Sequence, residues 1–205
     1  MILYEFEGKE LLSNVGVSVP KSQLLISPAD AVGLRLPIVL KAQVLSGKRA
    51  ASGGIIICEK ISNFKFQISN LFGKTINNER VGKVLAEEKV AYTKPGYYVS
   101  LAYDTNSRGP VLTVSKSGGT GVEERSVENY PVDPLSMEAP DCGLPVDLID
   151  KLIKLFFEED MLLLEINPLV QAGDTWIALD AKIKLDDNAE GRRERKFPPR
   201  GAPGY

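Results

Sequence analysis

Two short segments near the carboxyl end of the chain have the alternation of a β-hairpin, and this pattern constrains the fold more than any other. Residues 164–170 read Leu-Glu-Ile-Asn-Pro-Leu-Val, and residues 179–182 read Leu-Asp-Ala-Lys. Side chains two residues apart share one face of a strand, so Glu165 and Asn167 are expected on one face, opposite their apolar neighbours. The same rule groups Asp180 with Lys182.

A turn around residues 171–174 would place Glu165 opposite Asp180 and Asn167 opposite Ala178. Two acidic side chains facing each other destabilise a strand pair, and a hard divalent cation held by carboxylate and amide oxygens resolves the repulsion. This face is therefore a candidate cation site, with magnesium the natural ion. The alternative is an ordinary hairpin whose polar face meets water, with Lys182 or another base neutralising the acids.

Composition limits the other function classes. The chain has 205 residues, 43% of them hydrophobic, which suits one large domain or two small lobes. A net charge of −2 does not favour nucleic acid or an anionic membrane as a partner. No apolar stretch approaches the roughly 20 residues of a membrane span, so we expect a cytoplasmic protein.

The chain contains no histidine, which excludes a histidine-based catalytic set, an imidazole zinc ligand and a phosphohistidine within the chain itself. Any phosphohistidine step would need a second chain. The two cysteines, Cys58 and Cys142, show no metal-ligand or disulfide spacing, so both are expected to be reduced.

Apolar runs alternate with turn signals along the rest of the chain, as in an α+β fold. Residues 20–90 are expected to form a small mixed lobe, and the last residues, 193–205, a linker or disordered tail. The expected helices span residues 4–14, 28–37, 64–71 and 146–159, and the expected strands span residues 38–44, 55–58, 84–89, 97–104 and 111–115.

A lysine within a buried strand provides a second candidate site. Lys41 lies in an apolar strand, where its charge requires an anionic partner, and a phosphate would serve. The following loop, residues 46–54, supplies glycines such as Gly47 and Gly53, the cations Lys48 and Arg49, and backbone N–H groups that phosphate oxygens could approach. The alternative is a hairpin turn with Lys41 facing solvent.

Two further features fit a nucleotide site. The glycine-containing loop at residues 115–124 has the composition of a cover over a bound substrate, although a plain hairpin connection is an equal alternative. Glu87 and Glu88 close a strand and could bond an adenine or ribose edge, although a charged strand end is more often solvated.

Taken together, these residues resemble the ATP-grasp region of succinyl-CoA synthetase beta subunits. The resemblance is carried by the chain start at residues 4–12, Lys41-Ala42-Gln43-Val44, the loop ending Gly53-Gly54, Ser-x-x-Gly-Gly at 115–119, residues 165–170 and residues 179–189. It covers residues 1–192.

The resemblance implies an ATP-grasp fold, with nucleotide between a small mixed lobe (20–90) and a larger antiparallel-sheet lobe (1–19 and 91–192). The carboxy-terminal domain of such ligases would be absent. It also implies Mg²⁺ at Asn167 and Asp180, supported by Glu165. The implied contacts to ATP or ADP, with GTP or GDP possible, are made by Lys41, Gly47, Arg49, Gly53, Glu87 and Glu88.

In that family the phosphoryl group passes to a histidine on an alpha subunit that also carries the coenzyme A site, so no catalytic residue is expected in this chain. The ADP-forming acid–CoA ligase reaction would need that partner. In residues 47–54, two glycines and a lysine of the family's glycine-rich loop are replaced by other residues. Two alternatives stay open, namely an ATP-citrate lyase or malate–CoA ligase type of subunit, and a degenerate ATP-grasp module without catalysis.

Overall fold

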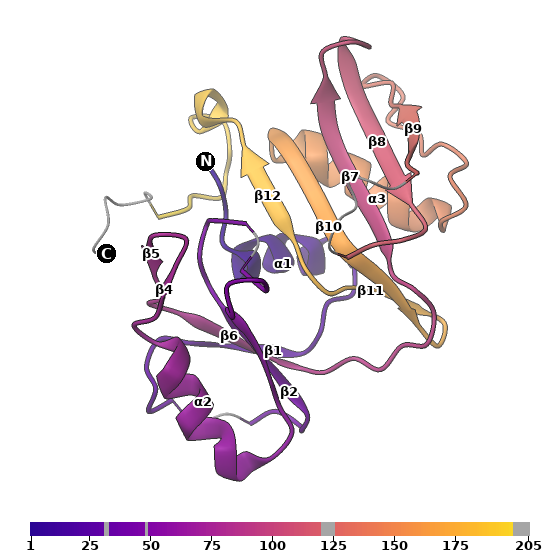
Figure 1. Cartoon of the computed structure of the whole chain (residues 1–205). Coiled ribbons are helices and arrows are strands. Elements are labelled where there is room, and N and C mark those ends of the chain that lie inside the picture. Colours follow the sequence, from indigo (N-terminus) through magenta and orange to yellow (C-terminus); the bar gives the residue numbers. More distant parts are fainter. Residues whose placement is uncertain (31–32, 48, 120–125, 199–205) are drawn as a thin grey trace. The chain divides into compact units, whose positions relative to one another are not determined.

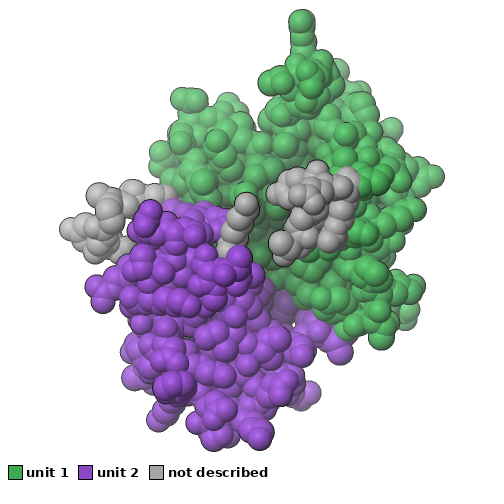
Figure 2. All heavy atoms as spheres, viewed as in Figure 1, with its two compact units in different colours: residues 1–19, 92–199 green, residues 20–91, 200–205 purple. Residues whose placement is uncertain are grey.

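The computed structural model describes residues 1–30, 33–47, 49–119 and 126–198. The chain divides into two compact units, which are coloured separately in Figure 2. Unit 1 consists of Met1–Val19 and residues 92–198, and unit 2 consists of Pro20–Ala91. Each unit has its own antiparallel sheet and its own apolar core.

Unit 1 is built on a six-stranded sheet in the order β11-β10-β7-β8-β9, with β12 also paired to β10 (Figure 1). Strand β10 has β7 along one edge, while β11 and β12 follow one another along the other edge. Residues 179–181 join β11 to β12 and belong to neither strand. The bounds are β7 Tyr97–Asp104, β8 Gly109–Ser115, β9 Glu128–Pro131, β10 Met161–Ala172, β11 Thr175–Ala178 and β12 Lys182–Leu185.

Helices α1 (Glu5–Asn14) and α3 (Val146–Glu158) cover one face of this sheet (Figure 1). Helix α3 packs on β10, α1 packs on β12, and the two helices touch each other. The apolar residues of α3 recur at helical spacing, and Leu152 and Phe156 are completely buried against the sheet. A short 3₁₀ helix, Asp187–Ala189, follows β12.

Unit 2 contains a four-stranded sheet in the order β1-β6-β2-β3, with helix α2 packed against it. A small hairpin, β4–β5, turns through Asn77 and Asn78, which both have positive φ, as a two-residue type I′ turn requires. The bounds are β1 Ser22–Leu25, β2 Ile38–Ala42, β3 Ile55–Cys58, a 3₁₀ helix Ile61–Asn63, α2 Phe64–Leu71, β4 Thr75–Ile76, β5 Glu79–Arg80 and β6 Val84–Glu88.

Several predicted elements are confirmed, and one is wrong. Helices 4–14, 64–71 and 146–159 and all five predicted strands occur within a few residues of the expected bounds. The helix expected from Pro28 does not occur in the described residues of that stretch, 28–30 and 33–37. The Asp30 carboxylate instead accepts hydrogen bonds from the N–H groups of Ile26 and Ser27, at 2.8 and 3.0 Å, and so closes a local turn.

Within the described ranges, no helix has both the length and the apolar character needed to cross a lipid bilayer.

Candidate functional site

The β10–β11 hairpin turns through only two residues, so the register predicted for it is wrong. Ala172 pairs with Thr175, which leaves Gly173 and Asp174 as the turn. Gly173 has a φ of +61°, a conformation that glycine adopts without steric cost and that such tight hairpins need. In this register Ala178 is opposite Leu169, not Asn167.

Glu165 is accordingly opposite Lys182, two positions beyond Asp180. The Lys182 Nζ lies 4.0 Å from the Glu165 Oε2, so the two charges neutralise one another. Glu165 and Asp180 are therefore not directly opposite one another, as the inference of a cation had assumed. The predicted faces are nevertheless correct, because Leu164 and Ile166 are fully buried while Glu165 and Asn167 are partly exposed.

Asn167 and Asp180 occupy facing register positions where strand structure is interrupted between β11 and β12, at residues 179–181. We call this interruption the gap. The Leu179 N–H donates to the Pro168 carbonyl oxygen at 3.0 Å, which continues the register of β11 and sets Asp180 across from Asn167. The Asp180 Oδ1 accepts a hydrogen bond from the Ala181 N–H at 2.8 Å. The pairing of β10 with β7 is also irregular beside Asn167, between Ile166 and Leu169.

Glycines bring other backbone segments against this gap. A Cβ atom on Gly96 would lie 2.5 Å from the Pro168 Cβ, and one on Gly118 would lie 2.7 Å from the Tyr97 carbonyl oxygen. The Gly118 N–H donates to the Gly96 carbonyl oxygen at 2.6 Å. The Asn167 amide bonds both the N–H and the carbonyl oxygen of Gly119, at 2.5 and 3.3 Å. The rest of the predicted cover loop, residues 120–124, lies outside the described residues.

The donor atoms at the gap suit a hard cation. An amide oxygen has two lone pairs, of which the Gly119 N–H uses one at Asn167, and a carboxylate such as that of Asp180 has about four acceptor positions. Across the described ranges, no group of three or more His, Cys, Asp or Glu side chains could hold a metal ion. Magnesium, however, commonly uses only one or two carboxylates, together with water and phosphate oxygens. Asn167 and Asp180 therefore fit such an ion.

In unit 2, the structure brings two predicted site residues together. Lys41 on β2 is buried, so the alternative that it faces solvent is wrong. Its Nζ lies 2.7 Å from the Glu87 Oε2 on the neighbouring strand β6. Glu87 thus supplies an anionic partner for the buried lysine.

The loop after β2 is held by its own backbone and by Arg49. The buried Arg49 guanidinium donates from Nη1 to the Ala42 carbonyl oxygen at 3.1 Å, and the Gly54 N–H donates to the Arg49 carbonyl oxygen at 2.7 Å. Gly53 has a φ of +67°, and the exposed Gly47 accepts a hydrogen bond from Asn77 at its carbonyl oxygen. Lys48 lies outside the described residues.

Glu88 makes contacts different from those of Glu87. Its Oε1 accepts a hydrogen bond from the Arg35 N–H at 3.0 Å and lies 3.5 Å from the Lys21 Nζ. The Arg35 N–H, and then the Lys21 ammonium, lower the pKa of this carboxyl below its usual value.

Sequence reasoning missed two participants at the gap, Gly96 and Lys9. Lys9 on α1 is buried, and its Nζ donates to the Leu179 carbonyl oxygen at 2.7 Å. A glycine in a helix interior often marks close packing, so Gly8 was the one sequence signal that this part of α1 packs closely against another segment. A Cβ atom there would lie 3.3 Å from the Ala181 Cβ.

Comparisons with known proteins agree with this architecture. The ATP-grasp domain family matches residues 2–133. The succinate–CoA ligase (ADP-forming) subunit beta of Methanocaldococcus jannaschii is 34% identical over 216 residues, covering 94% of this chain and 59% of that protein. The protein of the same name from Bacillus subtilis is 32% identical and covers 95% of this chain and 59% of its own length. The chain thus spans about three fifths of these curated relatives.

Solved structures show the same fold. An ATP citrate lyase from Methanothrix soehngenii, in complex with citrate and coenzyme A, has a TM-score of 0.73 at 22% identity, covering 96% of this chain and 55% of that one. A dinucleotide-forming acetyl-coenzyme A synthetase 1 from Ca. Korarchaeum cryptofilum, solved with coenzyme A and Ca-AMPCP, has a TM-score of 0.68 at 21% identity. It covers 90% of this chain and 93% of that one.

Proposed function

Because the chain belongs to the ATP-grasp family, we propose that it is the nucleotide-binding part of an acid–CoA ligase beta subunit of the succinyl-CoA synthetase type. The observation that carries this proposal is the pair Asn167 and Asp180, which hold facing register positions on the polar side of β10. Their oxygen atoms are of the kind that Mg²⁺ prefers.

Within unit 1, we assign Asn167 and Asp180 to Mg²⁺ and give Glu165 a supporting role. When bound, magnesium would neutralise charge on the nucleotide phosphates during phosphoryl transfer. The Gly119 backbone orients the Asn167 amide, and the Ala181 N–H orients the Asp180 carboxylate. Glu165 is partly neutralised by Lys182, which favours support over direct coordination.

Within unit 2, we assign the nucleotide contacts to Lys41, Gly47, Arg49, Gly53, Glu87 and Glu88. Lys41 is already oriented by Glu87, so a bound phosphate would share or replace that carboxylate as the partner of the ammonium. Arg49 fixes the loop through the Ala42 carbonyl oxygen. The backbone N–H groups of this loop would approach the phosphate oxygens.

We further propose that a partner alpha subunit supplies the histidine that receives the phosphoryl group and the coenzyme A site. The absence of histidine from this chain supports that division of labour. Either ATP or GTP would fit the assigned contacts. We place the protein in the cytoplasm, a proposal supported by the free thiols of Cys58 and Cys142.

Calorimetric titration of ADP and ATP into the chain, with and without Mg²⁺, tests the proposal. We expect Mg²⁺-dependent binding in the natural chain and a loss of about 10-fold or more in Asp180→Asn, because a ligand of the ion is replaced. Asp174→Asn is the matched control, since it makes the same substitution at the exposed turn of the same hairpin.

Two outcomes would contradict the proposal. Nucleotide affinity that ignores Mg²⁺, or that is equal in Asp180→Asn and the natural chain, would remove the metal assignment. No nucleotide binding under any condition would favour the alternative of a degenerate ATP-grasp module.

A further inference from the structure

Helix α1 carries a buried ion pair that the proposed nucleotide contacts do not use. The Lys9 Nζ lies 2.7 Å from the Glu5 Oε1, and the two side chains are 3% and 2% exposed. A pair at this i,i+4 spacing usually lies on the outer face of a helix, where it needs no desolvation. Burial of both charges is costly unless their hydrogen bonds are well made, so the position of this pair calls for an explanation.

The lysine reaches the backbone next to Asp180. Its Nζ donates to the Leu179 carbonyl oxygen at 2.7 Å, and that carbonyl belongs to the peptide linking Leu179 to Asp180. On the other side of the same residue, the Leu179 N–H donates to the Pro168 carbonyl oxygen. Lys9 and β10 therefore hold the backbone just before Asp180 from two directions.

Helix α1 also packs closely against Ala181, the residue after Asp180. A Cβ atom on Gly8 would lie 3.3 Å from the Ala181 Cβ and 3.4 Å from the Ile183 Cδ1. Glycine at this position thus allows the helix to approach the joining segment closely enough for Lys9 to reach Leu179. Residues 179–181 lie in neither β11 nor β12, so these contacts replace part of the strand pairing that would otherwise fix them.

We infer that Lys9, oriented by Glu5, is a positioning residue that fixes the Leu179–Ala181 segment and so aims the Asp180 carboxylate at the metal. This inference rests on the proposed function of Asp180. Residues that orient a metal ligand without touching the ion usually change metal affinity by about 10- to 100-fold when replaced. We expect an effect of that size from the loss of Lys9.

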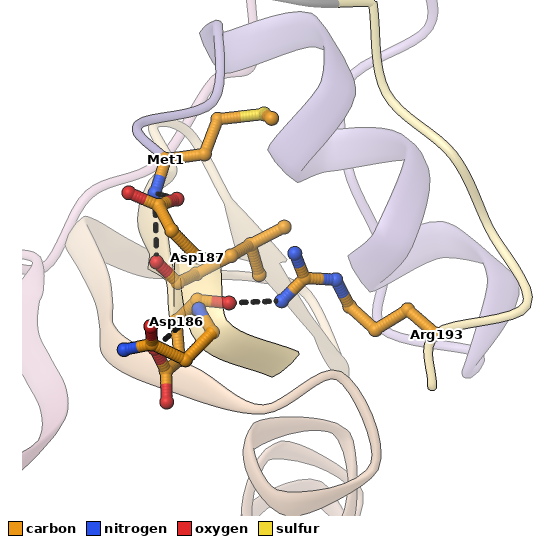
Figure 3. A network of polar contacts seen from close by, with 6 residues as sticks. Met1, Asp186, Asp187 and Arg193 are labelled. Atoms are coloured by element: carbon orange, nitrogen blue, oxygen red, sulfur yellow. Dashed lines mark hydrogen bonds and ion pairs between the residues drawn. The ribbon is translucent and has the colours of Figure 1, made fainter. Parts of the chain in front are cut away.

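The main variant of the test removes both charges of the pair, because removing one alone would leave the other buried without its partner. In Glu5→Gln/Lys9→Met both charges are removed together and the side-chain lengths are kept, which protects the fold. Glu5→Gln alone retains the donor at Lys9. Arg193→Met is the matched control, because Arg193 is also a buried cation in unit 1 whose Nη1 donates to a backbone carbonyl oxygen, that of Asp186, at 2.7 Å (Figure 3).

Hydrogen exchange gives a readout that does not depend on nucleotide or metal. In the double variant, exchange of the amides of residues 179–181 should accelerate by about tenfold or more, as the segment opens locally. Exchange at Asp186 should not change in that variant. Arg193→Met should show the reverse pattern, with residues 179–181 unaffected.

The second readout is the Mg²⁺ concentration that gives half-maximal ADP binding in calorimetry. We expect it to rise by about 10- to 100-fold in the double variant, with metal-free ADP affinity unchanged, and to stay near the natural value in Glu5→Gln and Arg193→Met. When Glu5→Gln/Lys9→Met is combined with Asp180→Asn, this Mg²⁺ concentration should be no higher than in Asp180→Asn alone.

The outcomes separate the two claims. If the natural chain binds ADP with Mg²⁺ and the double variant has the same Mg²⁺ requirement or unaltered exchange at residues 179–181, the role of Lys9 is wrong while the proposed function stands. If the natural chain shows no Mg²⁺-dependent binding, the proposed function is wrong. The inference that Lys9 orients Asp180 toward a metal ion is then wrong as well.

Discussion

Lys41 on β2 and Glu87 on β6 form an ion pair with 2.7 Å between Nζ and Oε2, and both side chains are less than one-tenth exposed. The two residues are not directly opposite in the sheet, since Lys41 pairs with Leu85 and Glu87 with Val39, so the side chains meet diagonally. Each charge therefore has a partner that compensates for the loss of water. The contribution of Lys41 to stability and its proposed role in nucleotide binding can be separated experimentally.

Lys41→Met should lower the free energy of unfolding by about 3–5 kcal/mol, because it leaves the Glu87 carboxylate buried without its cation. Lys41→Met/Glu87→Leu should recover most of that loss, since apolar side chains of similar volume often replace a buried pair without penalty. Urea unfolding measures both. Nucleotide affinity, followed by calorimetry, should be weak in both variants, because neither has the ammonium proposed to contact phosphate.

The neighbouring pair of Lys21 and Glu88 provides the control. Its Lys21 side chain is 67% exposed and the charged atoms are 3.5 Å apart, so Lys21→Met should change the free energy of unfolding far less than Lys41→Met. Equal losses in the two single variants, or a double variant that regains nucleotide affinity, would contradict the roles given to Lys41.

Elements with strong local signals were predictable from the sequence. Strand β3 and helix α2 have the predicted bounds, because an apolar run and a helical repeat are each bounded by glycine or loop residues. The short β4–β5 hairpin was missed, although the Asn77-Asn78 pair is a recognisable type I′ turn sequence. The helix expected from Pro28 shows the reverse case, because a sequence typical of a helix start forms a turn instead. The Asp30 carboxylate accepts hydrogen bonds from the preceding N–H groups, and the described residues 28–30 and 33–37 contain no helix.

The site was predictable only to the level of strand faces. The face shared by Glu165 and Asn167 follows from the two-residue period of any strand, which is a local property. The partner of Glu165 depends on turn length, and a two-residue turn in place of four moves it from Asp180 to Lys182. The contact from Lys9 to Leu179 joins residues 170 positions apart, so no local pattern identifies Leu179 as the partner of Lys9.

Asp160 offers a pH test outside the site. The Arg192 guanidinium bonds both of its carboxylate oxygens and holds the pKa of this carboxyl below its usual value of 3.8. A lowered pKa in the folded state means that the stabilisation is complete above the unfolded pKa and is lost as pH falls through the folded pKa. The increment should be small, because the Arg192 side chain is 72% exposed and solvent screens the pair.

Carboxyl NMR titration should therefore find the pKa of Asp160 below 3.8 in the natural chain and closer to 3.8 in Arg192→Met. The stability difference between the natural chain and Asp160→Asn should be present at pH 7 and should shrink on acidification. Asparagine keeps the positive φ of Asp160 accessible, so backbone strain does not mask the effect. A stability difference that grows as pH falls would contradict a lowered pKa at Asp160.

Gly96→Ala tests whether close backbone packing holds Asn167 in place. The added Cβ would lie 2.5 Å from the Pro168 Cβ and 3.1 Å from a Val170 methyl, so β10 must shift at Pro168. Overpacking of this kind costs about 1–3 kcal/mol in the free energy of unfolding. Because Asn167 precedes Pro168, we also expect the Mg²⁺ concentration for half-maximal ADP binding to rise.

Gly109→Ala is the matched control, since it lies in the same sheet and an added Cβ there would come no closer than 3.9 Å to another atom. It should leave both the unfolding free energy and the Mg²⁺ requirement close to those of the natural chain. If Gly96→Ala lowered stability but left the Mg²⁺ requirement unchanged, the Asn167 amide would not depend on this packing. The hydrogen bonds with Gly119 would then be enough to hold the Asn167 amide, and the proposed metal contact would tolerate movement of Pro168.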